Sequence, residues 1–161
     1  MSTKTAFLFH WTIQKLFVIV CAVAANLSGE SMDPGAPAQT NPHTRRILLI
    51  EDERDVLDML HEILAAEGHS AHSTPDGKAG LACFLAHPFD IVFTDMNMPG
   101  ISGLDVAAEV KKIHPSVPVV LLTGWDMEDE PFDLKENGID LLIKKPFAIT
   151  DILRAIKLLC P

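Results

Sequence analysis

FTDMNMPG, from Phe93 to Gly100, is the stretch that decides how this sequence is interpreted. An apolar run stops at Asp95, and the chain then breaks at the turn-forming pair Pro99-Gly100. Apolar residues before a sharp turn predict a short buried strand that ends on a carboxylate. Any turn residue could end such a strand, so we interpret Asp95 as a residue placed there for its chemistry.

Apolar runs alternate with amphipathic segments on both sides of this stretch. The helical pattern is clearest at 56–68, where apolar residues recur three and four positions apart before Gly68, a residue typical of helix ends. The pattern is poorest at 127–138. Strands are expected at 47–50, 69–74, 89–95, 117–123 and 140–145, and helices at 56–68, 76–87, 103–113, 127–138 and 149–159.

This alternation predicts an α/β fold. Short apolar strands joined by helices form a parallel sheet that is covered on both faces. Because such crossovers are right-handed, a doubly wound sheet of the five expected strands is the economical arrangement. Ligands of such sheets bind beyond the carboxyl ends of the strands, where the winding direction changes.

Polar residues stand at the carboxyl ends of these strands. Glu51 and Asp52 follow the first strand, and Asp95 ends the third. Thr123 ends the fourth strand, and Lys144-Lys145-Pro146 ends the fifth. If the first and third strands are neighbours, three carboxylates converge, and a divalent cation is needed to offset their repulsion. Oxygen ligands with room for water favour Mg²⁺. Because the hydroxyl and ammonium groups would hold an anion, the set predicts a phosphoryl-transfer site with Asp as acceptor.

Four segments carry a resemblance to a known family. ILLIEDE (47–53), FTDMNMPG (93–100), LLTG (121–124) and IKKPF (143–147) appear in the order of the motifs of the response-regulator receiver domain. From about residue 45 to residue 160 the chain resembles this CheY-like family. The resemblance implies a flavodoxin-like, doubly wound sheet of five parallel strands in the order 2-1-3-4-5.

The resemblance also implies a role for each site residue. Asp95 would accept the phosphoryl group, Thr123 would move to hydrogen-bond its oxygens, and Lys145 would pair with it. The Lys145-Pro146 bond would be cis, an isomer that proline permits. The Mg²⁺ ligands would be Glu51, Asp52, Asp95 and the backbone carbonyl of Asn97.

The sequence departs from the family pattern at two positions. Glu51 stands where Asp is commoner, which lengthens one ligand arm and keeps the charge. Leu142 stands where the family usually has a switching Tyr or Phe. The second departure leaves phosphorylation intact and puts the usual aromatic output switch in question.

Two other functions are compatible with a strand-end Asp, and the sequence argues against both. A phosphohydrolase of the haloacid dehalogenase type needs a second Asp as general acid two residues after the first, and Asn97 stands there. A docking platform that works unphosphorylated would not need Asp95, Thr123 and Lys145 together. We therefore expect a non-enzymatic, single-domain response regulator that receives its phosphoryl group from a histidine kinase or histidine phosphotransfer protein. It would act on an unidentified protein target or as a phosphorelay intermediate.

Charge and cysteine content set limits on partners and compartment. Of 13 basic and 22 acidic residues, two of each precede residue 45, so the net charge of -9 lies after it. Because no basic stripe is present, nucleic-acid binding is not expected. The three cysteines form no CxxC pair, which favours a reducing compartment, and the cytoplasm suits the predicted chemistry.

The first 44 residues are predicted to be separate from a receiver domain at 45–161. The run from Leu16 to Ala25 is apolar, and a linker rich in Pro and Gly follows. We prefer a translation start at Met32, which makes residues 1–31 translated non-coding sequence. A membrane anchor, with Lys15 inside the bilayer at a cost of about 3 kcal/mol, is the second reading. A secretory signal is the third.

Overall fold

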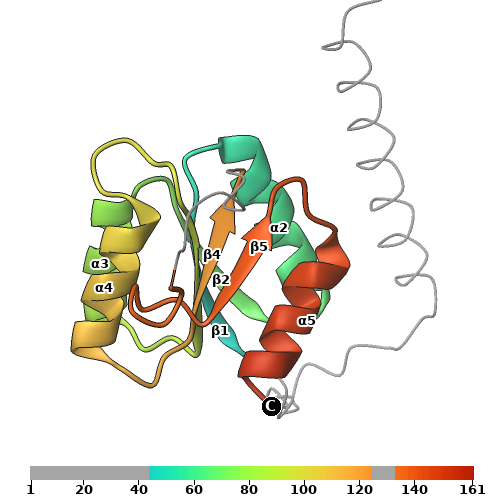
Figure 1. Cartoon of the computed structure of the whole chain (residues 1–161). Helices are drawn as coiled ribbons and strands as arrows, with labels where there is room; N and C mark the ends of the chain where they lie inside the picture. Colours follow the sequence, from blue (N-terminus) through green and yellow to red (C-terminus); the bar gives the residue numbers. More distant parts are fainter. Residues whose placement is uncertain (1–43, 125–132) are drawn as a thin grey trace, which may run out of the picture. The chain divides into compact units, whose positions relative to one another are not determined.

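The computed structural model describes residues 44–124 and 133–161 (Figure 1). This part of the chain forms a parallel sheet with helices on both faces. The strands are β1 (Arg46–Ile50), β2 (Ser70–Thr74), β3 (Ile91–Asp95), β4 (Val119–Thr123) and β5 (Leu141–Lys144), and the helices are α2 (Arg54–Ala66), α3 (Gly77–Ala86), α4 (Gly103–Ile113) and α5 (Ile149–Leu159).

The five strands lie in the order β2-β1-β3-β4-β5, and each neighbouring pair is parallel. The predicted fold class and strand order are therefore confirmed. Because β1 lies between β2 and β3, the winding direction changes beside β1 and β3. The carboxyl ends of these two strands carry Glu51 and Asp95.

The central strand β1 contributes side chains to two apolar cores. Ile47 and Leu49 of β1 pack with α2 and α5, whereas Leu48 and Ile50 pack with α3 and α4. This alternation follows from the two-residue period of a strand, and it requires a strand that is apolar at every position. Figure 1 shows the same arrangement, with α2 and α5 on one side of the sheet and α3 and α4 on the other.

Local signals in the sequence mark where the helices begin and end. Asp76 accepts a hydrogen bond from Ala79 N–H before α3, and Ser102 accepts one from Asp105 N–H before α4. Both side chains satisfy backbone donors that a helix leaves open at its start. Gly68 follows α2 with φ +82°, a backbone conformation that favours glycine.

The prediction of a helix at 127–138 is wrong for residues 133–138, the part of this segment that the structure describes. Residues 133–138 form turns: Asp133 Oδ1 accepts hydrogen bonds from the backbone N–H groups of Lys135 and Glu136. Gly138 has φ +73° and leads directly into β5. The short side chain of Asp133 thus stabilises a local turn in place of a helix. Residues 127–132 lie outside the described part of the chain.

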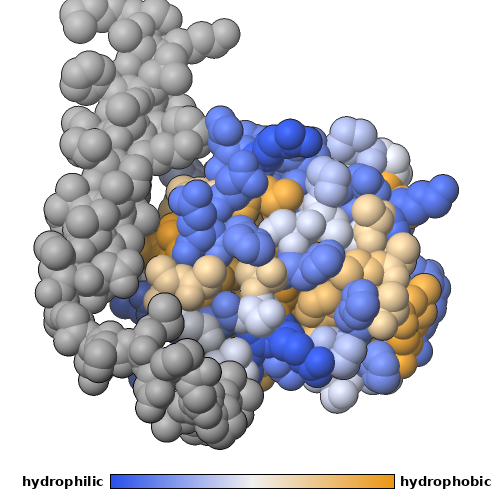
Figure 2. Space-filling view, turned by 180° about the vertical axis from the view of Figure 1, so that it is seen from behind, coloured by the Kyte–Doolittle hydropathy of each residue, from blue (hydrophilic) through white to orange (hydrophobic). Residues whose placement is uncertain are grey.

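The expectations for the N-terminal segment also lie outside the described residues, except for Thr44, and remain predictions. Within residues 44–124 and 133–161, no helix is both long and apolar enough to cross a membrane. Seen from behind, hydrophobic and hydrophilic residues are interspersed on the surface (Figure 2). The most exposed large apolar side chains of this part are Leu85 on α3 and Leu158 on α5.

Candidate functional site

The strand register places the predicted site residues at one edge of the sheet. Ile50 of β1 lies opposite Thr94 of β3, so Glu51 and Asp95 follow at neighbouring positions. Thr123 of β4 lies opposite Lys144 of β5. Strand pairing alone therefore gathers residues that are far apart in the sequence.

Three carboxylates meet at this edge. One ligand oxygen from each of Glu51, Asp52 and Asp95 lies within 4.8 Å of the other two. Glu51 is 1% exposed and Asp95 is 5% exposed, whereas Asp52 faces solvent. The cluster therefore has two buried carboxylates and one that solvent reaches, and it opens outward on the side of Asp52.

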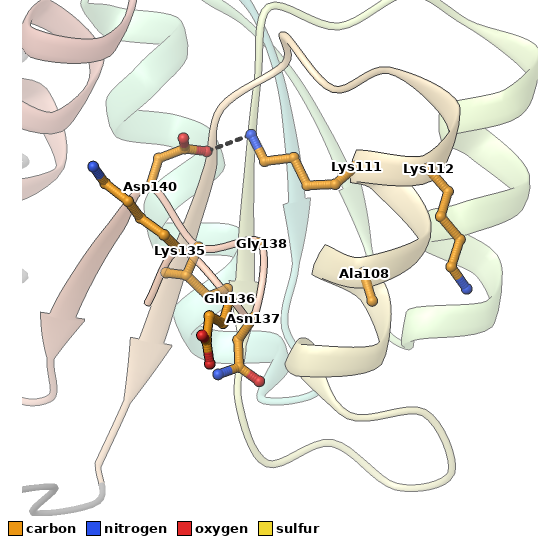
Figure 3. Close-up of a pocket in the computed structure, with 9 residues that line it drawn as sticks. Ala108, Lys111, Lys112, Lys135, Glu136, Asn137, Gly138 and Asp140 are labelled. Carbon is orange, nitrogen blue, oxygen red and sulfur yellow. Dashed lines mark ion pairs between the residues drawn. The ribbon is translucent and has the colours of Figure 1, made fainter. Parts of the chain in front are cut away.

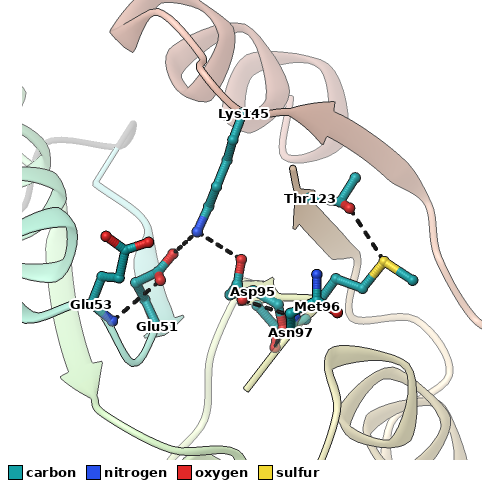
Figure 4. A network of polar contacts seen from close by, with 8 residues as sticks. Glu51, Glu53, Asp95, Met96, Asn97, Thr123 and Lys145 are labelled. Atoms are coloured by element: carbon teal, nitrogen blue, oxygen red, sulfur yellow. Dashed lines mark hydrogen bonds and ion pairs between the residues drawn. The ribbon is translucent and has the colours of Figure 1, made fainter. Parts of the chain in front are cut away.

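Lys145 bridges the two buried carboxylates (Figure 4). Its Nζ lies 2.7 Å from Glu51 Oε2 and 2.7 Å from Asp95 Oδ1. Its backbone N–H donates to the carbonyl oxygen of Thr123, and its bond to Pro146 is cis, as the resemblance implied. Lys144 is exposed, so the lysine next to the proline is the one that faces the acids.

The buried charges influence one another. Burial raises the pKa of Glu51 above its usual value, and the hydrogen bond from Lys145 opposes this effect without overcoming it. Burial by itself would lower the pKa of Lys145, but its hydrogen bonds to Asp95 and Glu51 raise that pKa overall. The ammonium form of Lys145 is thus favoured, whereas burial disfavours the charged form of Glu51. Three carboxylates share this one ammonium, so ionised acids at the site would carry more charge than Lys145 neutralises.

The two remaining predicted residues have different surroundings. The backbone N–H of Asn97 donates to Asp95 Oδ2 at 2.8 Å; its carbonyl is the group that was predicted as a ligand. The hydroxyl of Thr123 donates to the sulfur of Met96 at 3.2 Å (Figure 4). In this structure Lys145 and Asn97 therefore contact the Asp95 carboxylate, and the Thr123 hydroxyl is directed at Met96.

Sequence reasoning missed two residues that shape the site. Met96 accepts the Thr123 hydroxyl, and no sequence signal distinguishes it from an ordinary core methionine. Gly103 lies so close to the backbone oxygen of Asp95 that a Cβ atom would clash with it. A glycine directly after the capping residue Ser102 was the signal that could have identified this close approach.

A surface hollow lies at the other edge of the sheet, away from these acids (Figure 3). It lies between the C-terminal end of α4 and the turn before β5. Lys111 Nζ crosses it to Asp140 Oδ2 at 2.7 Å and also donates to the carbonyl oxygen of Val117. Asp140 Oδ2 accepts from Val119 N–H as well. These contacts join the starts of β4 and β5, so we assign the hollow a structural role.

The acidic cluster suits a small divalent cation. Its donors are carboxylate oxygens, which Mg²⁺ prefers, and the exposed position of Asp52 leaves room for the waters that Mg²⁺ retains. Fold and site together define a class: a doubly wound α/β domain with an acidic, lysine-bridged edge at the switch point of its sheet.

The family follows from comparison with known proteins. The model of the response regulator receiver domain matches residues 47–157. The chain therefore belongs to the response regulator receiver family, the receiver domains of two-component systems.

Curated relatives match the same part of the chain. The transcriptional regulatory protein RprY of Bacteroides fragilis is 35% identical over 107 residues, which cover 66% of this chain and 45% of RprY. QseB of Haemophilus influenzae, another transcriptional regulatory protein, is 36% identical over 107 residues, which cover 66% of this chain and 48% of QseB. The chain thus spans about half the length of the curated relatives it matches.

Solved structures resemble the described fold. The response regulator TrrA of Thermotoga maritima, crystallised in complex with Mg²⁺-BeF, is 32% identical with a TM-score of 0.65, covering 72% of this chain and 99% of TrrA. TrrA in complex with the histidine kinase ThkA also matches, at 30% identity and a TM-score of 0.65, covering 73% of this chain and all of TrrA. The chemotaxis protein CheY4 of Vibrio cholerae is 22% identical with a TM-score of 0.68, covering 72% of this chain and 98% of CheY4, and it supports the fold alone.

Proposed function

We propose that this receiver accepts a phosphoryl group on Asp95, in the presence of Mg²⁺, from a phosphohistidine of a histidine kinase or histidine phosphotransfer protein. One observation carries the proposal: Asp95 is buried beside the acids Glu51 and Asp52 while Lys145 contacts one of its oxygens. A carboxylate that only ended a strand would need neither acidic neighbours nor a contact with a lysine that follows β5, two strands away in the sheet.

Each residue has a role in this transfer. An oxygen of the Asp95 carboxylate attacks phosphorus, a P–O bond forms, and the P–N bond to the donor imidazole breaks. The imidazole nitrogen keeps the electron pair and takes up a proton. Lys145 balances the charge of the acyl phosphate, and Thr123 hydrogen-bonds its oxygens after moving toward them. When bound by Glu51, Asp52, Asp95 and the Asn97 carbonyl, Mg²⁺ supplies positive charge to the transferring oxygens.

Two solved structures of one relative support the cofactor and the donor. TrrA, which is matched along nearly its whole length, has been crystallised with Mg²⁺-BeF and with a histidine kinase. Phosphate attached to a carboxylate through Mg²⁺-dependent chemistry would make the chain a signalling domain, as receiver domains are, and not a classical enzyme. We infer a cytoplasmic location from this chemistry.

How the receiver passes on its signal is proposed only in general terms. RprY and QseB are transcriptional regulatory proteins about twice as long as the matched region. Phosphorylation of Asp95 would support a role as a switch acting on a protein target or as a phosphorelay intermediate, and its absence would support a docking platform that works without phosphate. The absence of nucleic-acid binding and the role of Leu142 stay predictions.

Phosphate-affinity gels test the acceptor. The full chain is incubated with acetyl phosphate and Mg²⁺, and we expect a retarded band that is absent with EDTA and absent in Asp95→Asn. Asp58→Asn, the same change at an exposed position of α2, is expected to behave as wild type. Equal retardation of Asp95→Asn and wild type would reject Asp95 as acceptor, and no retardation of either would favour the phosphate-independent docking role.

A further inference from the structure

The hydroxyl of Thr123 is held by the residue next to the proposed acceptor. Thr123 is fully buried, and its hydroxyl donates to Met96 Sδ at 3.2 Å. The two oxygens of Asp95 are meanwhile engaged by the ammonium of Lys145 and the backbone N–H of Asn97. Figure 4 shows the thioether of Met96 lying against the Thr123 hydroxyl. In this arrangement the hydroxyl is directed at the thioether.

We propose that Met96 is a positioning residue whose sulfur retains Thr123 in the arrangement that cannot contact a phosphoryl group. The inference rests on the proposed function, in which the Thr123 hydroxyl moves to the phosphoryl oxygens. Met96 then sets the fraction of molecules that is ready to accept and hold the phosphoryl group. A ligand that needs the Thr123 hydroxyl to have left the sulfur binds more weakly when this ready fraction is small.

The backbone of Met96 cannot follow a movement of its side chain easily. Its N–H donates to the carbonyl oxygen of Leu122 at 2.8 Å, and its own carbonyl oxygen accepts from Gly103 N–H at 3.1 Å. These bonds attach the residue to β4 on one side and to the start of α4 on the other. The hydrogen bond from Thr123 is therefore made or broken by side-chain rotation, for which methionine has three rotatable bonds.

A thioether sulfur can accept the hydrogen bond from the Thr123 hydroxyl and can also release it. Met96 is 8% exposed, so solvent competes little for the Thr123 proton. Sulfur is nevertheless a weak acceptor, whereas a phosphoryl oxygen carries charge and accepts a hydrogen bond about twice as strong as a neutral oxygen does. The Thr123 hydroxyl is thus retained in the free protein and released when a phosphoryl group arrives.

Replacement of Met96 by Leu removes the acceptor and nearly conserves the side-chain volume. Met98 provides a matched control, because it is also 8% exposed and packs in the same apolar cluster. The affinity of the full chain for beryllofluoride with Mg²⁺ is measured by calorimetry in wild type, Met96→Leu and Met98→Leu. We expect Met96→Leu to bind about two- to fivefold more tightly, the size of one weak net hydrogen bond, and Met98→Leu to bind as wild type.

A double-mutant cycle separates positioning from general packing. In a Thr123→Val background the hydroxyl is absent, so Met96→Leu should no longer change the affinity. If Met96 only filled space, Met96→Leu would change the affinity for beryllofluoride in the Thr123→Val background as much as it does in wild type. Thermal unfolding of each variant is recorded first, and Met96→Ile offers a second side chain without sulfur if leucine packs poorly.

The outcomes distinguish this inference from the function on which it rests. If wild type binds beryllofluoride and Asp95→Asn does not, the proposed function stands. Equal affinity of Met96→Leu and Met98→Leu, or tighter binding by Met96→Leu in the Thr123→Val background, would then overturn the role of Met96 alone. No binding by wild type would overturn both.

Discussion

Lys145 determines the electrostatic balance of the acidic cluster in the free protein. Its ammonium lies 2.7 Å from an oxygen of Glu51 and 2.7 Å from an oxygen of Asp95. Glu51 is almost inaccessible to solvent, so water cannot screen it from its acidic neighbours. A bound cation would neutralise the same oxygens. At the scale of single residues, Lys145 and a bound cation would therefore compensate the same excess of negative charge.

We predict that Lys145→Gln binds Mg²⁺ about tenfold more tightly than wild type, a difference of roughly 1.4 kcal/mol. Removal of the ammonium leaves more uncompensated charge for the cation to neutralise. In EDTA the variant should be less stable by up to about 3 kcal/mol, because buried Glu51 loses its partner. Calorimetric titration with MgCl₂ and urea unfolding measure the two effects.

Lys144→Gln is the control for this prediction. It removes the same charge one residue earlier, where the side chain is exposed. We expect no more than a small change in Mg²⁺ affinity, since solvent and salt screen an exposed charge. Weaker Mg²⁺ binding by Lys145→Gln, or equal effects of the two substitutions, would contradict the electrostatic account.

The connection from β3 to α4 fixes the acceptor at the scale of elements. Residue Gly103 opens α4, and its N–H donates to the carbonyl oxygen of Met96. Its α-carbon approaches the backbone of Asp95 so closely that any side chain would displace one of the two elements. Ser102 caps α4 from the same connection. The helix start thus packs directly on the strand end that carries the candidate acceptor.

Gly103→Ala is predicted to destabilise the protein by about 1–3 kcal/mol and to slow phosphorylation of Asp95. The added Cβ meets a backbone oxygen that cannot rotate away, which outweighs alanine's better helix propensity of about 1 kcal/mol. Urea unfolding and phosphate-affinity gels measure the two consequences. Gly124→Ala is the control, because its Cβ would have no atom within 4 Å. Equal stability of the two variants would show that α4 and β3 separate without cost.

At the scale of the whole molecule, we expect the stability in acid to depend on His69, the residue directly before β2. His69 Nδ1 accepts a hydrogen bond from the backbone N–H of Arg45 at 3.3 Å, next to the start of the β1–β2 pair. Burial lowers the pKa of His69; the charge of Arg45 adds to the effect, and Glu67 opposes it. The folded domain therefore holds this imidazole neutral more firmly than the unfolded chain does.

Stability is accordingly predicted to fall as the pH drops. The unfolded chain takes up a proton on His69 near pH 6.5, whereas the folded domain does so only at its lower pKa. The contribution of His69 is present above pH 6.5 and is lost between these two values. His69→Gln, which keeps an acceptor and does not titrate, should lose less stability between pH 7.5 and pH 5 (about the range in which histidine titrates). Urea unfolding at both pH values measures this, and equal losses in the two proteins would assign the acid sensitivity to other groups.

Periodic patterns and strand-end residues were sufficient to predict the architecture and most of the candidate site residues. Continuous apolar strands between amphipathic helices require a sheet covered on both faces, and polar residues at the strand ends must then share one edge. Glu51, Asp52 and Asp95 were identified in this way, the family resemblance selected Lys145 over Lys144, and the structure brings the four residues together. Such patterns involve residues that are close together along the chain, so the sequence is enough to predict them.

The tertiary structure alone decided which atoms contact one another. Lys145 bridges Glu51 and Asp95 only because β5 and β1 end at the same level on opposite sides of β3 and β4. The direction of the Thr123 hydroxyl toward Met96 depends on side-chain rotamers, and packing selects these. Residues 133–138 form turns in which the Asp133 carboxylate accepts hydrogen bonds from the backbone N–H groups of Lys135 and Glu136. No periodic pattern in the sequence encodes contacts between distant residues or the choice of rotamer, because both arise only when the helices and strands pack together.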